Sequence, residues 1–156
     1  MKRRILVSVL LAALLLLPAS ARAAITIVVH YDYGGGTVLD VATFENDKGK
    51  SALIGMKGPF NNAHIAASVA FGCGEWASFT ALGKKAEGMQ SNAFQFVGTW
   101  KETNTTQQAL LTVAAGPGVQ FTISDQPGTL FFILLPKDFA SFNSALATVA
   151  AFCNPK

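Results

Sequence analysis

Three short apolar segments near the C-terminus, separated by two turns that contain Pro-Gly, constrain the fold of this 156-residue chain most strongly. The turn sequences are Gly116-Pro117-Gly118 and Gln126-Pro127-Gly128. Proline presets φ at the second position of a tight turn, and glycine supplies the positive φ that a type II turn needs at its third. The spacing therefore predicts an antiparallel meander of strands at residues 109–115, 119–125 and 129–135.

The side-chain patterns of these strands differ. Val119, Phe121 and Ile123 alternate with polar residues, which predicts a strand that is covered on one face. The segment TLFFILL at 129–135 shows no alternation. We therefore expect it to be a central strand, buried on both faces.

Four more strands are expected upstream. Segments 37–45 and 51–57 form a pair joined by a polar turn in which Gly49 takes a positive φ, and segment 94–102 precedes the meander. The segment ITIVVHYDY at 25–33 alternates with a period of two. One predicted face carries Ile25, Ile27, Val29, Tyr31 and Tyr33, and the other carries Thr26, Val28, His30 and Asp32.

Two segments have helical periodicity. Beyond Pro136, with Asp138 as the N-cap, apolar residues recur at spacings of three and four: Phe139, Phe142, Leu146, Val149 and Cys153. A second helix is expected from Asn62 to about Ala86, with a stripe at Ile65, Val69, Cys73, Trp76 and Thr80. Gly72 and Gly74 would each cost on the order of 1 kcal/mol inside a helix, so a break at the cysteine, or a pair of strands, stays open as an alternative.

These segments together predict an α+β fold. We expect an antiparallel sheet of six or seven strands, packed against a C-terminal helix and a central Ala-rich helical segment.

The N-terminal residues 1–23 have the pattern of a secretory signal peptide. Basic residues precede an apolar run from Ile5 to Leu17, and Ala21-Arg22-Ala23 offers a cleavage site. The run of 13 residues is too short to span a bilayer comfortably, and no cysteine lies at the cleavage point for a lipid anchor. We therefore expect residues 24–156 to be one exported soluble domain, periplasmic or secreted.

Cleavage would change the charge balance. Removing Lys2, Arg3, Arg4 and Arg22 leaves eight basic residues against nine acidic ones, a net charge of about −1, and no arginine. Arginine is the residue best suited to bidentate recognition of phosphate or guanine. Nucleic acid is therefore not an expected partner.

Cys73 and Cys153 are the two cysteines of the chain. An oxidising compartment favours a disulfide between them. By the chain-entropy estimate, closing this loop would stabilise the folded state by roughly 4.5 kcal/mol. The competing hypothesis makes Cys73 a thiolate nucleophile that uses His30 or His64 as base. His64 lies nine residues earlier, about 13 Å along a helix, which favours the structural disulfide.

Other candidate chemistry is weaker. His30, Asp32 and His64 could supply zinc ligands, but nothing in their spacing requires it, and a solvated strand face explains the first two. Gly34-Gly35-Gly36 lacks the Gly-Lys-Ser/Thr that completes a phosphate loop. No Ser-His-Asp set and no carboxylate pair of defined separation can be assembled. We therefore assign no catalytic residue, metal site or cofactor.

Three functional hypotheses follow. The leading one is an exported, non-catalytic binding or accessory protein whose partner is another protein or an apolar ligand. The alternative is a carrier of an apolar small molecule, held between helix and sheet in an incompletely filled Phe-rich interior. A thiol or metal-dependent enzyme is the third. Sheet-and-helix folds host many unrelated functions, so the fold alone does not choose among them.

Overall fold

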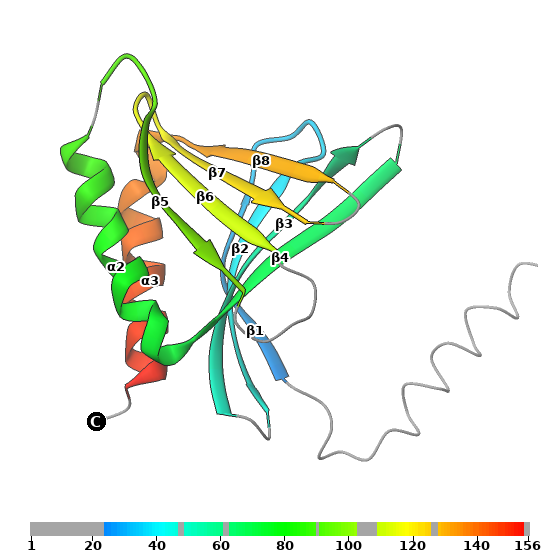
Figure 1. Cartoon of the computed structure of the whole chain (residues 1–156), viewed down its shortest axis with the longest axis vertical. Helices are drawn as coiled ribbons and strands as arrows, with labels where there is room; N and C mark the ends of the chain where they lie inside the picture. The colour runs from blue at the N-terminus through cyan, green and yellow to red at the C-terminus, as the bar shows by residue number, and fades with distance from the viewer. Residues whose placement is uncertain are drawn as a thin grey trace, which may run out of the picture.

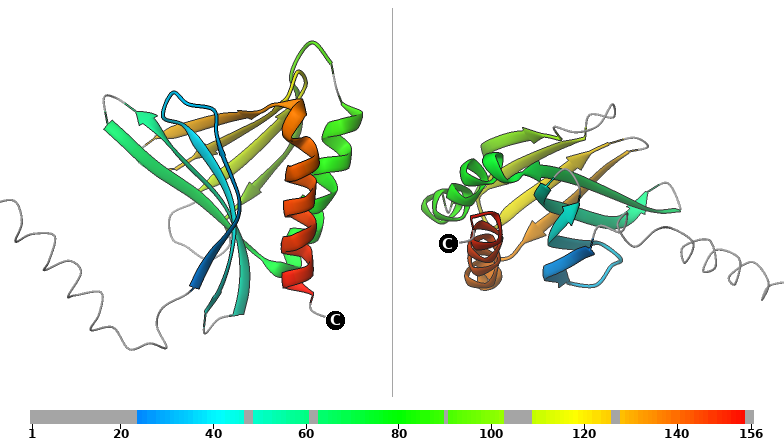
Figure 2. Two further views of the ribbon diagram at one scale, coloured as in Figure 1. Left: turned by 180° about the vertical axis from the view of Figure 1, so that it is seen from behind. Right: turned by 90° about the horizontal axis from the view of Figure 1, so that it is seen from below.

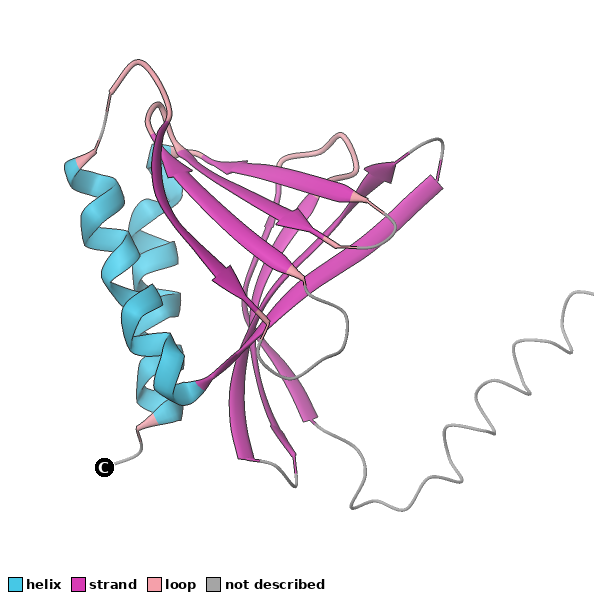
Figure 3. Ribbon diagram, in the orientation of Figure 1, coloured by secondary structure: helices cyan, strands magenta, loops and turns pink. Residues whose placement is uncertain are grey.

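The computed structural model describes residues 24–46, 49–60, 63–89, 91–102, 109–125 and 128–154. Within these ranges it contains two four-stranded antiparallel sheets and two long helices (Figures 1 and 3). The predicted α+β class is confirmed, although the eight strands form two sheets where we expected one sheet of six or seven. The predicted signal peptide at 1–23 and the turn residues 126–127 lie outside the described residues.

The first sheet is built from three successive antiparallel pairings in the order β1-β2-β3-β4. Gly49, at the start of β3, has φ +116°, as the sequence predicts. The strands are β1 (Ala24–Asp32), β2 (Val38–Asn46), β3 (Gly49–Phe60) and β4 (Ala63–Gly72).

The second sheet has the order β5-β6-β7-β8, and its last three strands are the predicted meander. The expectation that the last strand is central is wrong, because β8 lies at an edge of this sheet and Phe131 is 62% exposed. Its burial does alternate, but apolar residues on the outward face hide the alternation in the sequence. The strands are β5 (Gln95–Lys101), β6 (Leu110–Ala115), β7 (Val119–Ser124) and β8 (Thr129–Leu134).

The turn at Gly116-Pro117-Gly118 uses glycine for a reason other than the expected positive φ. Neither glycine has a left-handed φ. A Cβ at Gly116 would lie 2.7 Å from the carbonyl oxygen of Ala93, and one at Gly118 would lie 2.5 Å from that of Leu134. Both glycines therefore permit a close approach of backbone from neighbouring segments.

The two helices are α2 (Cys73–Gly88) and α3 (Phe139–Cys153), the latter preceded by the 3-10 turn η2 (Pro136–Asp138). The predicted apolar face of α3 is confirmed, with all of its members buried except the half-buried Cys153.

The predicted helix from Asn62 is too long, because residues 63–72 form β4 and the helix begins at Cys73. The spacing of four between Ile65, Val69 and Cys73 is even, so it fits a strand face as well as a helix face. Pairing with β3 decides between them: Val69 lies opposite Ile54 and Phe71 opposite Ala52.

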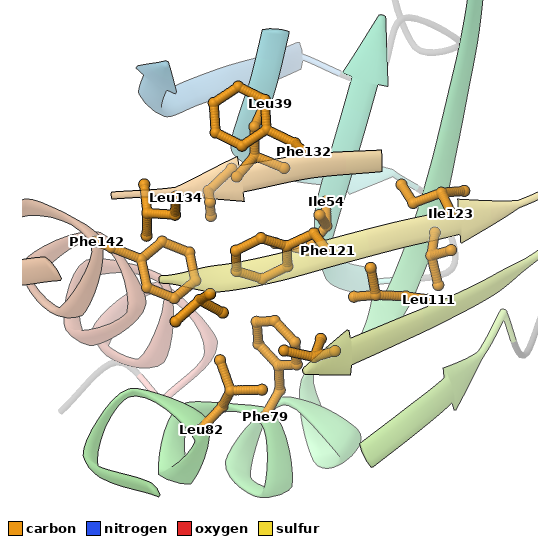
Figure 4. Close-up of a cluster of buried hydrophobic side chains, with 14 of the residues drawn as sticks. Leu39, Ile54, Phe79, Leu82, Leu111, Phe121, Ile123, Phe132, Leu134 and Phe142 are labelled. Carbon is orange, nitrogen blue, oxygen red and sulfur yellow. The ribbon is translucent and has the colours of Figure 1, made fainter. Parts of the chain in front are cut away.

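The core lies between the two sheets and the helix pair. Strand β3 contacts β8 and β4 contacts β7, while α3 packs on β1, β2 and β3 and α2 packs on β3 to β6. The helices lie side by side along one side of both sheets (Figure 2). Phe79 of α2, Phe142 of α3 and Phe121 of β7 point into the shared interior (Figure 4). Among the described residues, no helix has the length and apolarity needed to cross a membrane.

Candidate functional site

A β-bulge in β1 shapes the outer face of the first sheet. Ile27 lies opposite Ala42, whereas Val29 lies opposite the next residue back along β2, Val41. Val28 is therefore an extra residue on β1 without a directly opposed partner. Bulges of this kind re-aim side chains and increase the local twist of a strand.

The bulge reverses the orientation of the first residues of β1. Tyr31, beyond the bulge, is 6% exposed and belongs to the core, but Ile25 and Ile27 are 63% and 57% exposed. The prediction that the isoleucines and Tyr31 share one face is therefore wrong. A strict period of two is lost wherever a strand gains one residue.

Ile25 and Ile27 lie along a groove on the side of the first sheet that faces away from the core. The groove has a volume of about 380 Å³. We call it the outer groove, and it is lined by Ile25, Ile27, Asp40, Ala42, Leu53, Gly55, Met56, Lys57, Ala66, Ala67, Ser68 and Asp125.

Small residues at opposed positions of β3 and β4 leave open space in the middle of the outer groove. Gly55 on β3 lies opposite Ser68 on β4, and Ala66 lies opposite Lys57. Gly55 has no left-handed φ, and a Cβ built on it would meet only a Leu53 methyl group at 3.5 Å, an ordinary contact. The glycine therefore leaves open space in the groove and is not required by the backbone.

The outer groove has an apolar end and a charged end. One row across the strands is Ile27, Ala42, Leu53 and Ala70. The next outward-facing row, two residues along β3, runs His30, Asp40, Gly55 and Ser68, and the row after that includes Lys57 and Ala66. Apolar and charged positions are thus separated along the strand direction.

Asp40 is held in place at the charged end. Its carboxylate oxygen Oδ1 lies 2.6 Å from Nδ1 of His30, which is opposite it on β1. Both side chains keep contact with solvent, the Asp40 side chain being 27% exposed. Lys57, two residues beyond Gly55 on β3, and Asp125 also line the groove.

The three candidate zinc ligands are not brought together. His30 contacts Asp40, while Asp32 accepts a hydrogen bond from the Gly34 amide at 2.7 Å. His64 lies beside the glycine turn, where a Cβ on Gly36 would be 3.1 Å from its Cε1 atom. Within the described residues, no three His, Cys, Asp or Glu side chains are placed to hold a metal ion.

Cys73 and Cys153 form a disulfide, with a Cα–Cα distance of 5.2 Å. The bond joins the first residue of α2 to the last residue of α3. Glu75, the acid beside Cys73 in the sequence, accepts a hydrogen bond from the Gly72 amide at 3.3 Å and so caps the start of α2. Sulfur in a disulfide is not a thiolate, so this arrangement offers no nucleophile at Cys73.

A tyrosine cluster ties the end of β1 to the start of α3. The Tyr33 hydroxyl donates to the Asp138 carboxylate and accepts from the Leu135 amide at 3.2 Å. Burial and the bond to Asp138 raise the pKa of Tyr33 to about 12. Burial likewise raises the pKa of Tyr31, whose hydroxyl lies 2.8 Å from Ser141 Oγ.

Asp138 occupies the N-cap position of α3, as predicted, but its side chain makes no capping hydrogen bond to the helix. The Asp138 carboxylate accepts its hydrogen bond from Tyr33 instead, so Asp138 connects the segment after β1 to α3 and does not cap the helix. Neither tyrosine is ionised at neutral pH, so the cluster is a structural contact.

A second hollow of about 300 Å³ lies between α2 and α3 and is lined by Thr80, Lys84, Glu87, Asn143, Leu146, Ala147 and Ala150. Asn143 Nδ2 donates to Glu87 Oε1 at 2.7 Å across it. Lys85, next to Lys84 in α2, donates to the carbonyl of Val97 at 3.0 Å.

Sequence reasoning did not identify the outer groove. Gly55 was assigned to a strand without a function, the small residues at 66–68 were assigned to a helix, and the two isoleucines were placed on the same strand face as Tyr31. One available signal was the glycine-centred SALIGMK strand, because a glycine in the middle of a strand often marks a close approach or an open surface.

Comparison with models of known protein families gives no match, and comparison with curated protein sequences gives none either.

Proposed function

We propose that the protein is an exported, disulfide-stabilised, non-catalytic binding protein that takes an apolar ligand in the outer groove. The observation that carries this proposal is the bulge at Val28, which presents Ile25 and Ile27 to a groove of about 380 Å³. The N-terminal signal-peptide pattern supports export.

Exposed isoleucine side chains are costly to leave in water. Burying one fully is worth roughly 1.5–3 kcal/mol relative to leaving it exposed. A regular β1 would have kept both isoleucines on the core side of the sheet, with Val29 and Tyr31. Their presentation at a groove therefore supports a role in contacting an apolar group.

The groove also has a suitable size and composition. Its volume lies at the lower end of the roughly 300–1,000 Å³ range of small-molecule sites, which combine apolar walls with a few polar groups. The carrier hypothesis is thus kept, with the site moved from the interior to the sheet surface. Phe79, Phe121 and Phe142 occupy the space between helices and sheets (Figure 4).

A groove-filling variant tests the proposal. Gly55→Val adds a side chain to the middle of the groove, where the backbone and its neighbours accept a Cβ. Valine is favoured over glycine in strands, so the variant should unfold at equal or higher urea concentration than the wild type. We expect it to weaken binding of a neutral, solvent-sensitive apolar dye by at least about tenfold.

Phe131→Asn is the matched control, because Phe131 is 62% exposed on the outer face of the other sheet. Dye binding should survive this change and should fall with Ile27→Asn. Equal dye binding by the wild type and Gly55→Val would reject the outer groove as the site.

A further inference from the structure

Strand β1 is an open edge of the first sheet. Among the residues that the structure describes, its backbone pairs with β2 alone, and Figure 2 shows it at the outside of the fold. We propose that a second copy of this chain pairs antiparallel with β1 and joins two outer grooves into one site. The inference rests on the proposed function for the use of that site, which isoleucines of both copies would line.

The first part of β1 lacks the side chains that usually keep an edge strand from pairing. Natural edge strands carry lysine, proline or inward-pointing charges. The stretch Ala24–Val28 reads AITIV and contains none of these residues. Ile25 and Ile27 are more than half exposed on its outer side. An apolar edge of this kind favours the addition of another strand.

Two limits fix the centre of the paired stretch. The predicted cleavage after Ala23 makes Ala24 the first residue of the mature chain. At the other limit, the β-bulge at Val28 interrupts the regular strand. Thr26 lies midway between these limits. Because most homodimers have twofold symmetry, the axis would pass beside Thr26.

Pairing about Thr26 is self-complementary. Ile25 of one copy would lie opposite Ile27 of the other, and Thr26 would lie opposite its own counterpart. Opposed residues of an antiparallel pair stand on the same face of the sheet, so the isoleucines of both copies would gather on the outer side. His30 and Asp32 lie beyond the bulge and would face no residue of the mature second copy.

The short contact makes the dimer weak. The paired stretch and its half-exposed isoleucines bury far less than the roughly 1,200–2,000 Å² of a stable interface. Non-covalent association should therefore appear only at high protein concentration. A covalent trap reports the register of the pairing even when the dimer is a minor species.

Cysteine trapping tests this register on protein that starts at Ala24 and keeps its native disulfide. Opposed residues have Cα atoms about 4.5–5.5 Å apart, within the range of a disulfide, so Thr26→Cys should link two copies under mild oxidation. Residues offset by two positions lie about 7–8 Å apart, which is too far. Ile25→Cys and Ile27→Cys should therefore stay monomeric alone and link to each other when mixed.

Phe131→Cys is the matched control, because Phe131 is 62% exposed but lies on the other sheet. Pairing raises the effective concentration of one thiol beside the other, so Thr26→Cys should link at least about tenfold faster than this control. A second measurement uses no added cysteine. Ile25→Lys places a charge on the edge and should abolish the concentration-dependent association that sedimentation equilibrium detects for the wild type.

The outcomes separate this inference from the proposed function. Thr26→Cys linking no faster than Phe131→Cys, or Ile25→Cys linking alone as fast as Thr26→Cys, would overturn the second copy paired at Thr26. The linked dimer should bind the neutral dye more tightly than the Thr26→Ser monomer at the same low concentration, and equal binding would overturn the shared site. Absence of dye binding in both forms, with the expected linking pattern, would reject the proposed function while the paired edge stands.

Discussion

The contact between Gly83 of α2 and Asn143 of α3 leads to a quantitative prediction about helix packing. Gly83 is buried in α2, and a Cβ at that position would overlap the side-chain oxygen of Asn143 and lie 2.8 Å from its Cγ. Asn143 in turn donates to Glu87 at 2.7 Å. Gly83→Ala should therefore force Asn143 to rotate and give up that hydrogen bond.

The magnitude follows from two opposing contributions. Alanine in place of glycine stabilises a helix interior by about 1 kcal/mol. Loss of a hydrogen bond to a charged acceptor costs about 2 kcal/mol. We expect Gly83→Ala alone to lower the free energy of unfolding by about 1 kcal/mol, and the same change in an Asn143→Ala background to raise it by about 1 kcal/mol.

Urea unfolding of the four proteins of this double-mutant cycle, followed by circular dichroism, measures the coupling directly. The expected interaction energy is about 2 kcal/mol, which is large for two side chains that are not in contact and ordinary for two that are. Gly74→Ala is the control, since a Cβ at Gly74 meets no atom within 4 Å. A gain of about 1 kcal/mol from Gly83→Ala in both backgrounds would show that the helices do not approach each other at this point.

Three more predictions concern the covalent and titration properties of the chain. Replacing Cys73 and Cys153 by serine should lower the free energy of unfolding by about 4.5 kcal/mol, the chain-entropy value for a sequence separation of 80, and a loss below about 1 kcal/mol in urea unfolding would contradict a native disulfide. Absorbance at 295 nm should show both tyrosines of the native protein titrating above pH 10, with the transition of Tyr33 near pH 12. Since the unfolded chain releases these protons near pH 10, the contribution of the two tyrosines to stability should be constant below that pH and be lost as the pH rises toward 12, and Tyr33→Phe should remove the later absorbance step. The intact mass of the exported protein should correspond to a chain that starts at Ala24, and non-reducing alkylation should add no mass; a retained N-terminal segment would contradict cleavage at Ala23.

Periodicity predicted the regular elements well where one physical requirement dominated. The apolar face of α3 was predicted residue by residue, because spacings of three and four fit no strand. The β6–β7–β8 meander was also predicted, because Pro-Gly pairs interrupt apolar segments at short intervals. These patterns are local, so neighbouring residues are sufficient to specify them.

Features that depend on distant partners were not predicted. Ile65 and Val69 fit either period, and only their pairing with β3 places them on a strand. The period-two alternation of this segment predicts a regular strand and does not indicate the bulge at Val28, yet the bulge decides which way Ile27 faces. The outer groove depends on both of these pairings, which explains why the candidate site was harder to predict than the fold.

The disulfide divides the chain into a covalent ring, residues 73–153, and an N-terminal tail. The ring contains both helices and the whole of the second sheet, whereas the first sheet lies entirely in the tail. The first sheet is a series of hairpins between sequence neighbours, so it can pair before the ring closes. The bond itself can form only after α3 has been synthesised, when every strand of both sheets is already present. Oxidation would then add a covalent link to a domain whose strands have already paired. The first sheet, which carries the outer groove, would depend least on this disulfide bond.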